Sequence, residues 1–221
     1  MLAFREIPSH ILYVLILSHR GYWKTPDQRN TLEAFEHSFS LGFGTETDVR
    51  DACGRLVISH DMPSGNEISL EDLLKIRRRF NQHLPLALNV KCDGMQAALQ
   101  IQMAGAENYF LFDMSVPDSL VTSRSGLRYF SRQSELEPTP ILLDRADGVW
   151  MDMFYGDWVT EDSIRVHLEH GRRVCLVSPE LHKRSYDSFW RTVATWELVR
   201  SESLMLCTDF PEEARAFFRI Q

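Results

Sequence analysis

The chain has 221 residues, of which 44% are hydrophobic and 25% are charged, and its formal net charge is -7. This composition is typical of a globular protein and excludes a disordered or fibrous chain, and the length fits one domain over residues 1–221. The negative charge argues against a nonspecific nucleic-acid partner, because a polyanion is normally bound by a basic surface. No stretch approaches the roughly 20 apolar residues of a membrane span.

The four cysteines are widely spaced and include no CxxC pair. They match neither a zinc site nor a dense disulfide framework, so we expect reduced thiols. The apolar run at 11–17 is too short for a signal peptide, because His19 and Arg20 soon interrupt it and no small-residue cleavage site follows. These features favour a cytoplasmic protein, and they leave its oligomeric state open.

Short apolar runs alternate with segments of helical spacing along the whole chain. The predicted elements, in order, are strand 11–19, helix 31–41, strand 44–50, helix 69–79, strand 85–91, helix 95–104, strand 109–114, helix 116–124, strand 127–133, strand 149–154, helix 161–170, strand 173–178, helix 186–200, strand 204–208 and helix 211–219. Between 133 and 148, Pro138, Pro140 and few apolar positions leave little room for a further helix. This alternation predicts a parallel sheet, and eight strands predict a closed (β/α)8 TIM barrel rather than an open sheet.

Residues at the predicted helix ends support these assignments. Asn30 or Thr31, Ser69 and Thr160 precede helical segments and are good N-caps. Gly42, Gly105 and Gly171 each follow a helical pattern, as a left-handed residue at a helix C-terminus does.

In such a barrel, polar residues at the carboxyl ends of the strands gather at one face, where these folds carry their chemistry. The sequence places His19, Arg20, Glu46, Asp48, Asn89 and Lys91 at the first strand ends, and His60 and Asp61 at the end of a short hairpin-like segment, LVISHD. The later ends carry Asp113, Glu135, Asp152, Glu180 and Asp209.

Glu46 and Asp48 are two residues apart in a predicted strand, so both carboxylates project to one side. Like charges placed in this way repel unless a cation or a shared proton lies between them. An isolated E-x-D more often faces water. Here the strand follows a helix and two glycines, which favours a divalent cation with oxygen ligands, Mg2+ or Ca2+.

His19 and His60 each end a strand-like segment. Either one alone is as well explained by a hydrogen bond at a strand end, but two of them around an acidic pair suit proton transfer near neutral pH. Arg20 and Lys91 add cations suited to a phosphate. This set describes phosphodiester cleavage better than acyl transfer, and neither GxSxG nor a glycine-rich phosphate loop is present.

Six motifs together resemble the glycerophosphodiester phosphodiesterase family, which is kin to the phosphatidylinositol-specific phospholipase C barrels. They are HRG at 19–21, NTLEAF at 30–35, ETDV at 46–49, LVISHD at 56–61, NVK at 89–91 and TDFPEEA at 208–214. The resemblance implies a TIM barrel, a divalent metal and hydrolysis of a glycerol-linked or related phosphodiester. It also implies that His19 and His60 are the acid and base, that Glu46 and Asp48 are metal ligands, and that Arg20 and Lys91 face the phosphate.

The chain departs from that family at two motifs. Where relatives read PENT, this chain has QRNT at 28–31, and where they carry the glutamate of an E-x-K motif, it has Asn89. An amide oxygen can coordinate Mg2+ or Ca2+, but without charge, so a further carboxylate is expected in the ligand set. Glu135 is the first candidate, with Asp113 and Asp152 after it.

Two further residues are predicted to line the substrate pocket: Asp61, which can orient His60, and Trp150, near the sixth strand end. The segment between 60 and 89 is short, which predicts a site that is open or closed by a partner subunit. The expected ligand is a small-molecule phosphodiester. A second hypothesis, motivated by Asn89, is a catalytically weak barrel that binds a phosphorylated sugar or a lipid headgroup.

Overall fold

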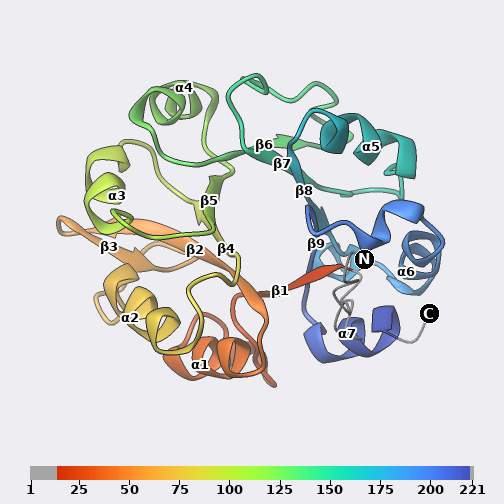
Figure 1. The fold of residues 1–221 in the computed structure, drawn as a ribbon. Helices are drawn as coiled ribbons and strands as arrows, with labels where there is room; N and C mark the ends of the chain where they lie inside the picture. The colour runs from red at the N-terminus through yellow and green to blue at the C-terminus, as the bar shows by residue number, and fades with distance from the viewer. Residues whose placement is uncertain (1–13, 220–221) are drawn as a thin grey trace, which may run out of the picture.

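The computed structural model describes residues 14–219 and contains a nearly closed barrel of eight parallel strands with helices around it (Figure 1). The parallel strands are β1 (Leu15–His19), β2 (Gly44–Ala52), β4 (Leu86–Val90), β5 (Tyr109–Phe112), β6 (Phe130–Gln133), β7 (Gly148–Met151), β8 (Arg173–Val177) and β9 (Leu204–Thr208). The predicted (β/α)8 fold is therefore confirmed. Residues 11–13 of the predicted first strand lie outside the described residues.

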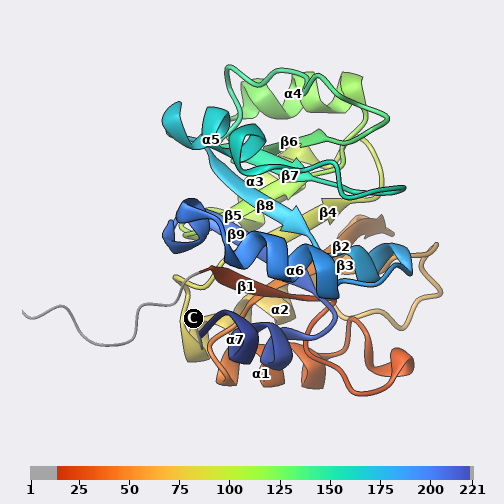
Figure 2. The same cartoon turned by 90° about the vertical axis from the view of Figure 1, so that its right-hand side faces the viewer.

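The strands follow one another around the barrel in the order β5-β4-β2-β1-β9-β8-β7-β6. The two ends of this path, β5 and β6, meet through an isolated parallel bridge between Leu111 and Tyr129. A ninth strand, β3 (Arg55–Ile58), pairs with β2 in the antiparallel sense, as the hairpin-like LVISHD segment predicted. The parallel strands run in a common direction, and the loops after β1, β3 and β7 extend beyond the same end of the barrel (Figure 2).

Residues 14–219 contain seven α-helices and three short 3-10 helices, which connect the strands or, in the case of α7, follow the last one. They are η1 (Pro26–Gln28), α1 (Leu32–Ser40), α2 (Leu70–Phe80), α3 (Gln96–Gln102), α4 (Val116–Ser125), α5 (Glu161–Glu169), η2 (Pro179–His182), α6 (Asp187–Ala194), η3 (Glu197–Arg200) and α7 (Pro211–Arg219). Thr31, Ser69 and Thr160 cap α1, α2 and α5 by accepting backbone N–H groups, as expected. No helix of the described chain is long and apolar enough to cross a membrane.

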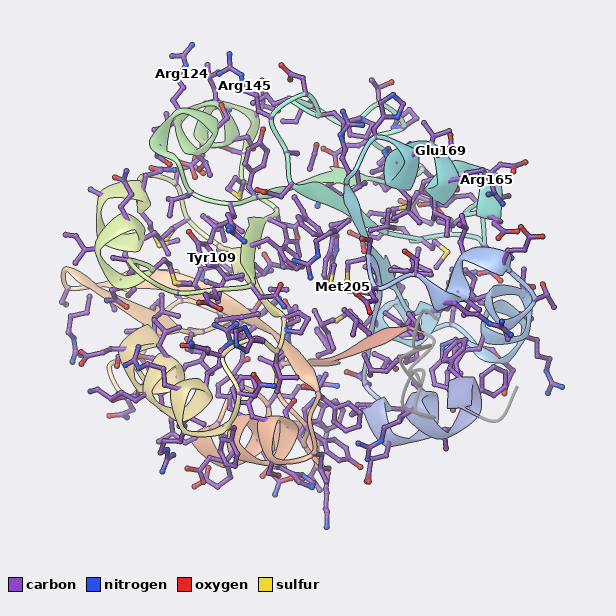
Figure 3. The ribbon with its side chains drawn as sticks, viewed as in Figure 1. Tyr109, Arg124, Arg145, Arg165, Glu169 and Met205 are labelled. Atoms are coloured by element: carbon purple, nitrogen blue, oxygen red, sulfur yellow. The ribbon has the colours of Figure 1, made fainter. Side chains whose placement is uncertain are left out.

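Apolar side chains fill the barrel interior and the space between the strands and the helices. The interior cluster contains Leu17, Ala87, Phe110, Phe112, Phe130, Trp150, Cys175, Val177, Met205 and Cys207. Within it Phe110 stacks on Phe130 with ring centroids 3.7 Å apart, and Phe112 stacks on Trp150 at 3.9 Å. Met205 lies in this interior, whereas Arg124, Arg165 and Glu169 extend outward from the ring of helices (Figure 3). The interior is a packed core, so a substrate has to bind at an end of the barrel.

Several predicted elements differ from the structure in extent. The strands predicted at 109–114 and 149–154 end earlier, as β5 at Phe112 and β7 at Met151. The predicted helix 186–200 is divided into α6 and η3, because Trp196 has an extended backbone (φ -73°, ψ 140°) and its side chain is buried in the core. The strand predicted at 127–133 begins at Phe130, after Leu127 and Tyr129 have packed into the cluster under α1–α3. The absence of a helix between β6 and β7 was predicted correctly: residues 134–147 form turns.

Candidate active site

The chain turns sharply after β1, and this turn directs Arg20 toward β2. Arg20 and Gly21 both have left-handed backbones, with φ of 58° and 80°. A Cβ atom at Gly21 would lie 2.8 Å from the Cβ of Ala34, so glycine is required by space as well as by φ. The Arg20 amide donates to the Glu46 carbonyl oxygen at 2.9 Å and its Nε lies 3.0 Å from Asp48 Oδ2. The glycine of the HRG motif thus allows the arginine to reach the acidic pair.

Glu46 and Asp48 lie in β2, level with the carboxyl ends of β1 and β4, and their exposed fractions are 2% and 0%. Burial, followed by repulsion from Asp48, raises the pKa of Glu46 well above its ordinary value. Burial alone would also raise the pKa of Asp48, but Arg20 and Lys91 outweigh it and lower that pKa. Lys91 Nζ is 3.3 Å from Asp48 Oδ1. Two buried carboxylates with opposite pKa shifts form an electrostatic environment that a cation would stabilise.

His19 lies between two carboxylates. Its Nδ1 is 2.7 Å from Asp209 Oδ1, and its Nε2 is 3.8 Å from Glu46 Oε2. Burial lowers the pKa of His19, although the hydrogen bond that His19 donates to Asp209 acts in the opposite direction. An imidazole that donates from Nδ1 to a carboxylate presents the lone pair of Nε2, which is the form that accepts a proton.

His60 lies on the loop after β3. Its Nδ1 is 2.9 Å from Asp61 Oδ1, and this pair is far more exposed than the His19–Asp209 pair. Its charge lowers the pKa of Asp48, so both imidazoles are within electrostatic reach of one carboxylate. A cavity of about 660 Å³ between the loops after β1 and β3 is lined by Arg20, Arg29, His60 and Asp61, among others.

Asn89 lies beside Asp48 in the register of β2 and β4. Its Oδ1 is buried without a hydrogen-bond partner, and Asp48 Oδ1 likewise accepts no well-aligned hydrogen bond. Within the described residues no three side chains of His, Cys, Asp and Glu are arranged to hold a metal ion. The two carboxylates with the Asn89 oxygen form an oxygen donor set of the kind that Mg2+ and Ca2+ prefer, so these residues fit such a cation.

Glu135, which was predicted as a metal ligand, and Trp150, which was predicted to line the pocket, contact other parts of the protein. The Glu135 carboxylate accepts hydrogen bonds from the amides of Phe154, Tyr155 and Gly156, which hold the loop after β7. Trp150 is packed in the barrel interior on Phe112. The reserve candidates are also paired: Asp113 with Asn89 and Arg132, and Asp152 with His182. The structure therefore gathers His19, Arg20, Glu46, Asp48, His60, Asn89 and Lys91, while Glu135 and Trp150 stabilise neighbouring parts.

Sequence reasoning did not select Asp209, Asn30 and Arg29 as site residues. Asp209 holds His19, and Arg29 Nη2 lies 3.5 Å from Asp209 Oδ2. The Asn30 side chain donates to Asp48 Oδ2 at 3.0 Å and accepts from the Thr47 hydroxyl at 2.8 Å. The motifs TDFP and NTLEAF contained Asp209 and Asn30, but nothing local to either motif indicates a partner 190 or 18 residues away.

Comparisons with known proteins give matches only at the level of structure. No family model matches the chain, and no curated protein does. Among solved structures, a glycerophosphodiester phosphodiesterase from Agrobacterium tumefaciens shares 17% identity over 92% of this chain and 98% of its own, with a TM-score of 0.65. One from Thermotoga maritima shares 16% identity over 94% and 98%, with a TM-score of 0.62.

A third similar structure is a phosphodiesterase from Oleispira antarctica in complex with its product sn-glycerol-3-phosphate. It shares 13% identity over 92% of this chain and 96% of its own, with a TM-score of 0.65. At these identities the comparisons establish the fold. The chain therefore has the barrel of glycerophosphodiester phosphodiesterases, the family that its sequence motifs resemble, over nearly its whole described length.

Proposed function

We propose that the chain is a metal-dependent phosphoric diester hydrolase that acts on glycerophosphodiesters or a chemically similar phosphodiester. The observation that carries the proposal is a cluster of cations and an imidazole around two buried carboxylates. Arg20 and Lys91 lie 3.0 and 3.3 Å from the Asp48 carboxylate, and His19 Nε2 lies 3.8 Å from that of Glu46. The names of the similar structures support the substrate class. We further propose that the protein acts in the cytoplasm, because its four cysteines are free thiols.

Glu46, Asp48 and Asn89 would hold the divalent cation. Glu135 is left out of this set, because three backbone amides already occupy its carboxylate. When bound, the cation supplies charge stabilisation to the phosphoryl oxygens of the transition state. Arg20 and Lys91, which pair with Asp48, add positive charge beside the same position and orient the phosphate.

Proton transfer is assigned to the two histidines. His19 is neutral at pH 7, because burial lowers its pKa, and its Nε2 takes a proton from the attacking hydroxyl group. Asp209 holds the ring and stabilises the imidazolium that forms. His60, on the loop after β3, donates a proton to the leaving alkoxide, and Asp61 orients its ring. The attacking group is water for hydrolysis and a substrate hydroxyl for cyclisation, and the two differ in product.

The test uses purified protein stripped with EDTA and assayed against several glycerophosphodiesters and a chromogenic bis-ester, with Mg2+, Ca2+ or Mn2+ restored. We expect turnover that needs metal, loss of turnover in His19→Ala and in His60→Ala, and no effect of His83→Ala, which changes an exposed histidine paired with Glu107. Phosphorus NMR distinguishes a monoester product from a cyclic one. Substrate binding without turnover would support the phosphate-binding barrel instead, and activity in both site variants would reject the assigned roles.

A further inference from the structure

In the side-chain amide of Asn89 the nitrogen has a hydrogen-bond partner and the oxygen has none. The side chain is 8% exposed, and its Nδ2 donates to Asp113 Oδ2 at 3.0 Å. Its Oδ1 is buried and accepts no hydrogen bond. A buried acceptor without a partner is unfavourable, so the oxygen is expected to meet a ligand in the working protein.

Asp113 determines which way this amide faces. A carboxylate can only accept hydrogen bonds, so it draws the NH2 group of Asn89 and turns the oxygen away. Asp113 is itself firmly held: it follows β5 with a left-handed backbone (φ 66°), and its Oδ1 lies 3.1 Å from Arg132 Nη1 on β6. Arg132 pairs in addition with Glu137. The orientation of the Asn89 amide therefore depends on a neighbour that is fixed independently.

The Asn89 oxygen has an acidic neighbour on the next strand. Asn89 and Asp48 are paired in the β2–β4 register, which places their side chains on the same face of the sheet. Asp48 Oδ1 is the second buried oxygen without a well-aligned hydrogen bond. Lys91 Nζ lies 3.3 Å from Asp48 Oδ1, and a divalent cation between the two oxygens would reduce their repulsion further.

We propose that Asp113 is a positioning residue that acts on the cation site through the Asn89 amide. Its carboxylate holds the amide nitrogen, aims the amide oxygen at the cation beside Asp48, and polarises that oxygen toward negative charge. Asp113, which acts through Asn89 rather than as a ligand itself, thereby compensates for the carboxylate that position 89 lacks. Carboxylates play this part behind histidine ligands, where their loss typically weakens metal binding about 10- to 100-fold. The inference rests on the proposed metal dependence and names how that site is completed.

The test measures Mn2+ binding by electron paramagnetic resonance, so it does not depend on turnover. Asp113→Asn keeps the shape of the side chain and removes its charge. The Asn89 amide can then rotate by about 180°, which exchanges its oxygen and nitrogen. We expect its Kd for Mn2+ to rise about 10- to 100-fold. Glu137→Gln, which removes the other carboxylate on Arg132, is the matched control and should stay within about threefold of the parent. Circular dichroism verifies that each variant is folded.

Asn89→Glu provides the second arm, because a direct carboxylate ligand no longer needs a neighbour to orient it. In that background, adding Asp113→Asn should not weaken Mn2+ binding. Equal Mn2+ affinity in Asp113→Asn and the parent would overturn the inference, as would the same loss with Glu at position 89. If the Mn2+ affinities of the variants follow this pattern but the protein hydrolyses no phosphodiester, the inference is supported and the proposed function is rejected. A folded parent that binds no Mn2+ would reject both.

Discussion

The pair of His19 and Asp209 allows a quantitative test of the site, because the chain contains a second histidine–aspartate pair that differs mainly in burial. In His19–Asp209 the side chains are 15% and 12% exposed, and in His60–Asp61 they are 46% and 93% exposed. The N···O distances are similar, 2.7 and 2.9 Å. Asp209→Asn and Asp61→Asn therefore remove the same charge from similar hydrogen bonds in different surroundings.

The expected magnitudes follow from that burial. A hydrogen bond to a charged group contributes about 1.5–3 kcal/mol, and each 1.36 kcal/mol of barrier is a factor of ten in rate. Asp209→Asn should therefore lower kcat/KM roughly 10- to 150-fold. An exposed ion pair contributes about 0–1 kcal/mol, so Asp61→Asn should lower kcat/KM at most about fivefold.

Two assays test this reasoning. The first is kcat/KM for a glycerophosphodiester across pH. The second is histidine titration by NMR, which needs no turnover. Because Asp209 raises the pKa of His19 against the effect of burial, Asp209→Asn should lower that pKa further. A larger loss of activity in Asp61→Asn than in Asp209→Asn, or an unchanged His19 titration in Asp209→Asn, would refute the argument.

Three further predictions concern the scaffold and are measured by urea denaturation. Gly148→Ala should cost about 3 kcal/mol of unfolding free energy, because a Cβ atom there would collide with a backbone carbonyl and an aromatic ring of neighbouring strands. The control Gly156→Ala, where a Cβ atom meets open space, should cost less than about 0.5 kcal/mol. Equal losses in the two variants would contradict this packing. Arg77→Met should cost about 3 kcal/mol, because the buried guanidinium donates to four backbone carbonyls, whereas Arg78→Met, at the surface, should be nearly neutral. Burial lowers the pKa of His167, so its stabilising contribution is present above the ordinary histidine pKa of 6.5 and is lost as pH falls through the folded pKa. His167→Gln should make the dependence of the unfolding free energy on pH less steep between pH 7.5 and 5.5, and an unchanged slope would exclude this role.

The fold could be predicted because its signals are local. Apolar runs of strand length mark the strands, good N-cap residues and left-handed glycines mark several of the helices, and eight repeats identify the barrel. The ends were less predictable where packing overrides spacing. Residues 195–196 carry no glycine or proline. It is burial of Trp196 that ends α6 and begins η3.

The site could be predicted only as far as strand ends determine it. His19, Glu46, Asp48 and Asn89 share an end of the barrel because parallel strands share a direction. Their individual partners depend on loop conformation, which a sequence pattern does not encode. Glu135 was a reasonable ligand by charge and position, but the turn after β7 presents three amide groups to it instead.

The ion pair between Asp113 and Arg132 crosses the seam where β5 and β6 meet through the isolated bridge of Leu111 and Tyr129. Separation of these two strands breaks this ion pair, and Asp113 then loses the cation that helps to hold its carboxylate beside the Asn89 amide. Opening of the barrel between β5 and β6 is then coupled to loss of order among the oxygen donors of the site. A cation bound at the site would thus stabilise the closed barrel. It would slow amide hydrogen exchange along the β5–β6 seam, which it does not contact.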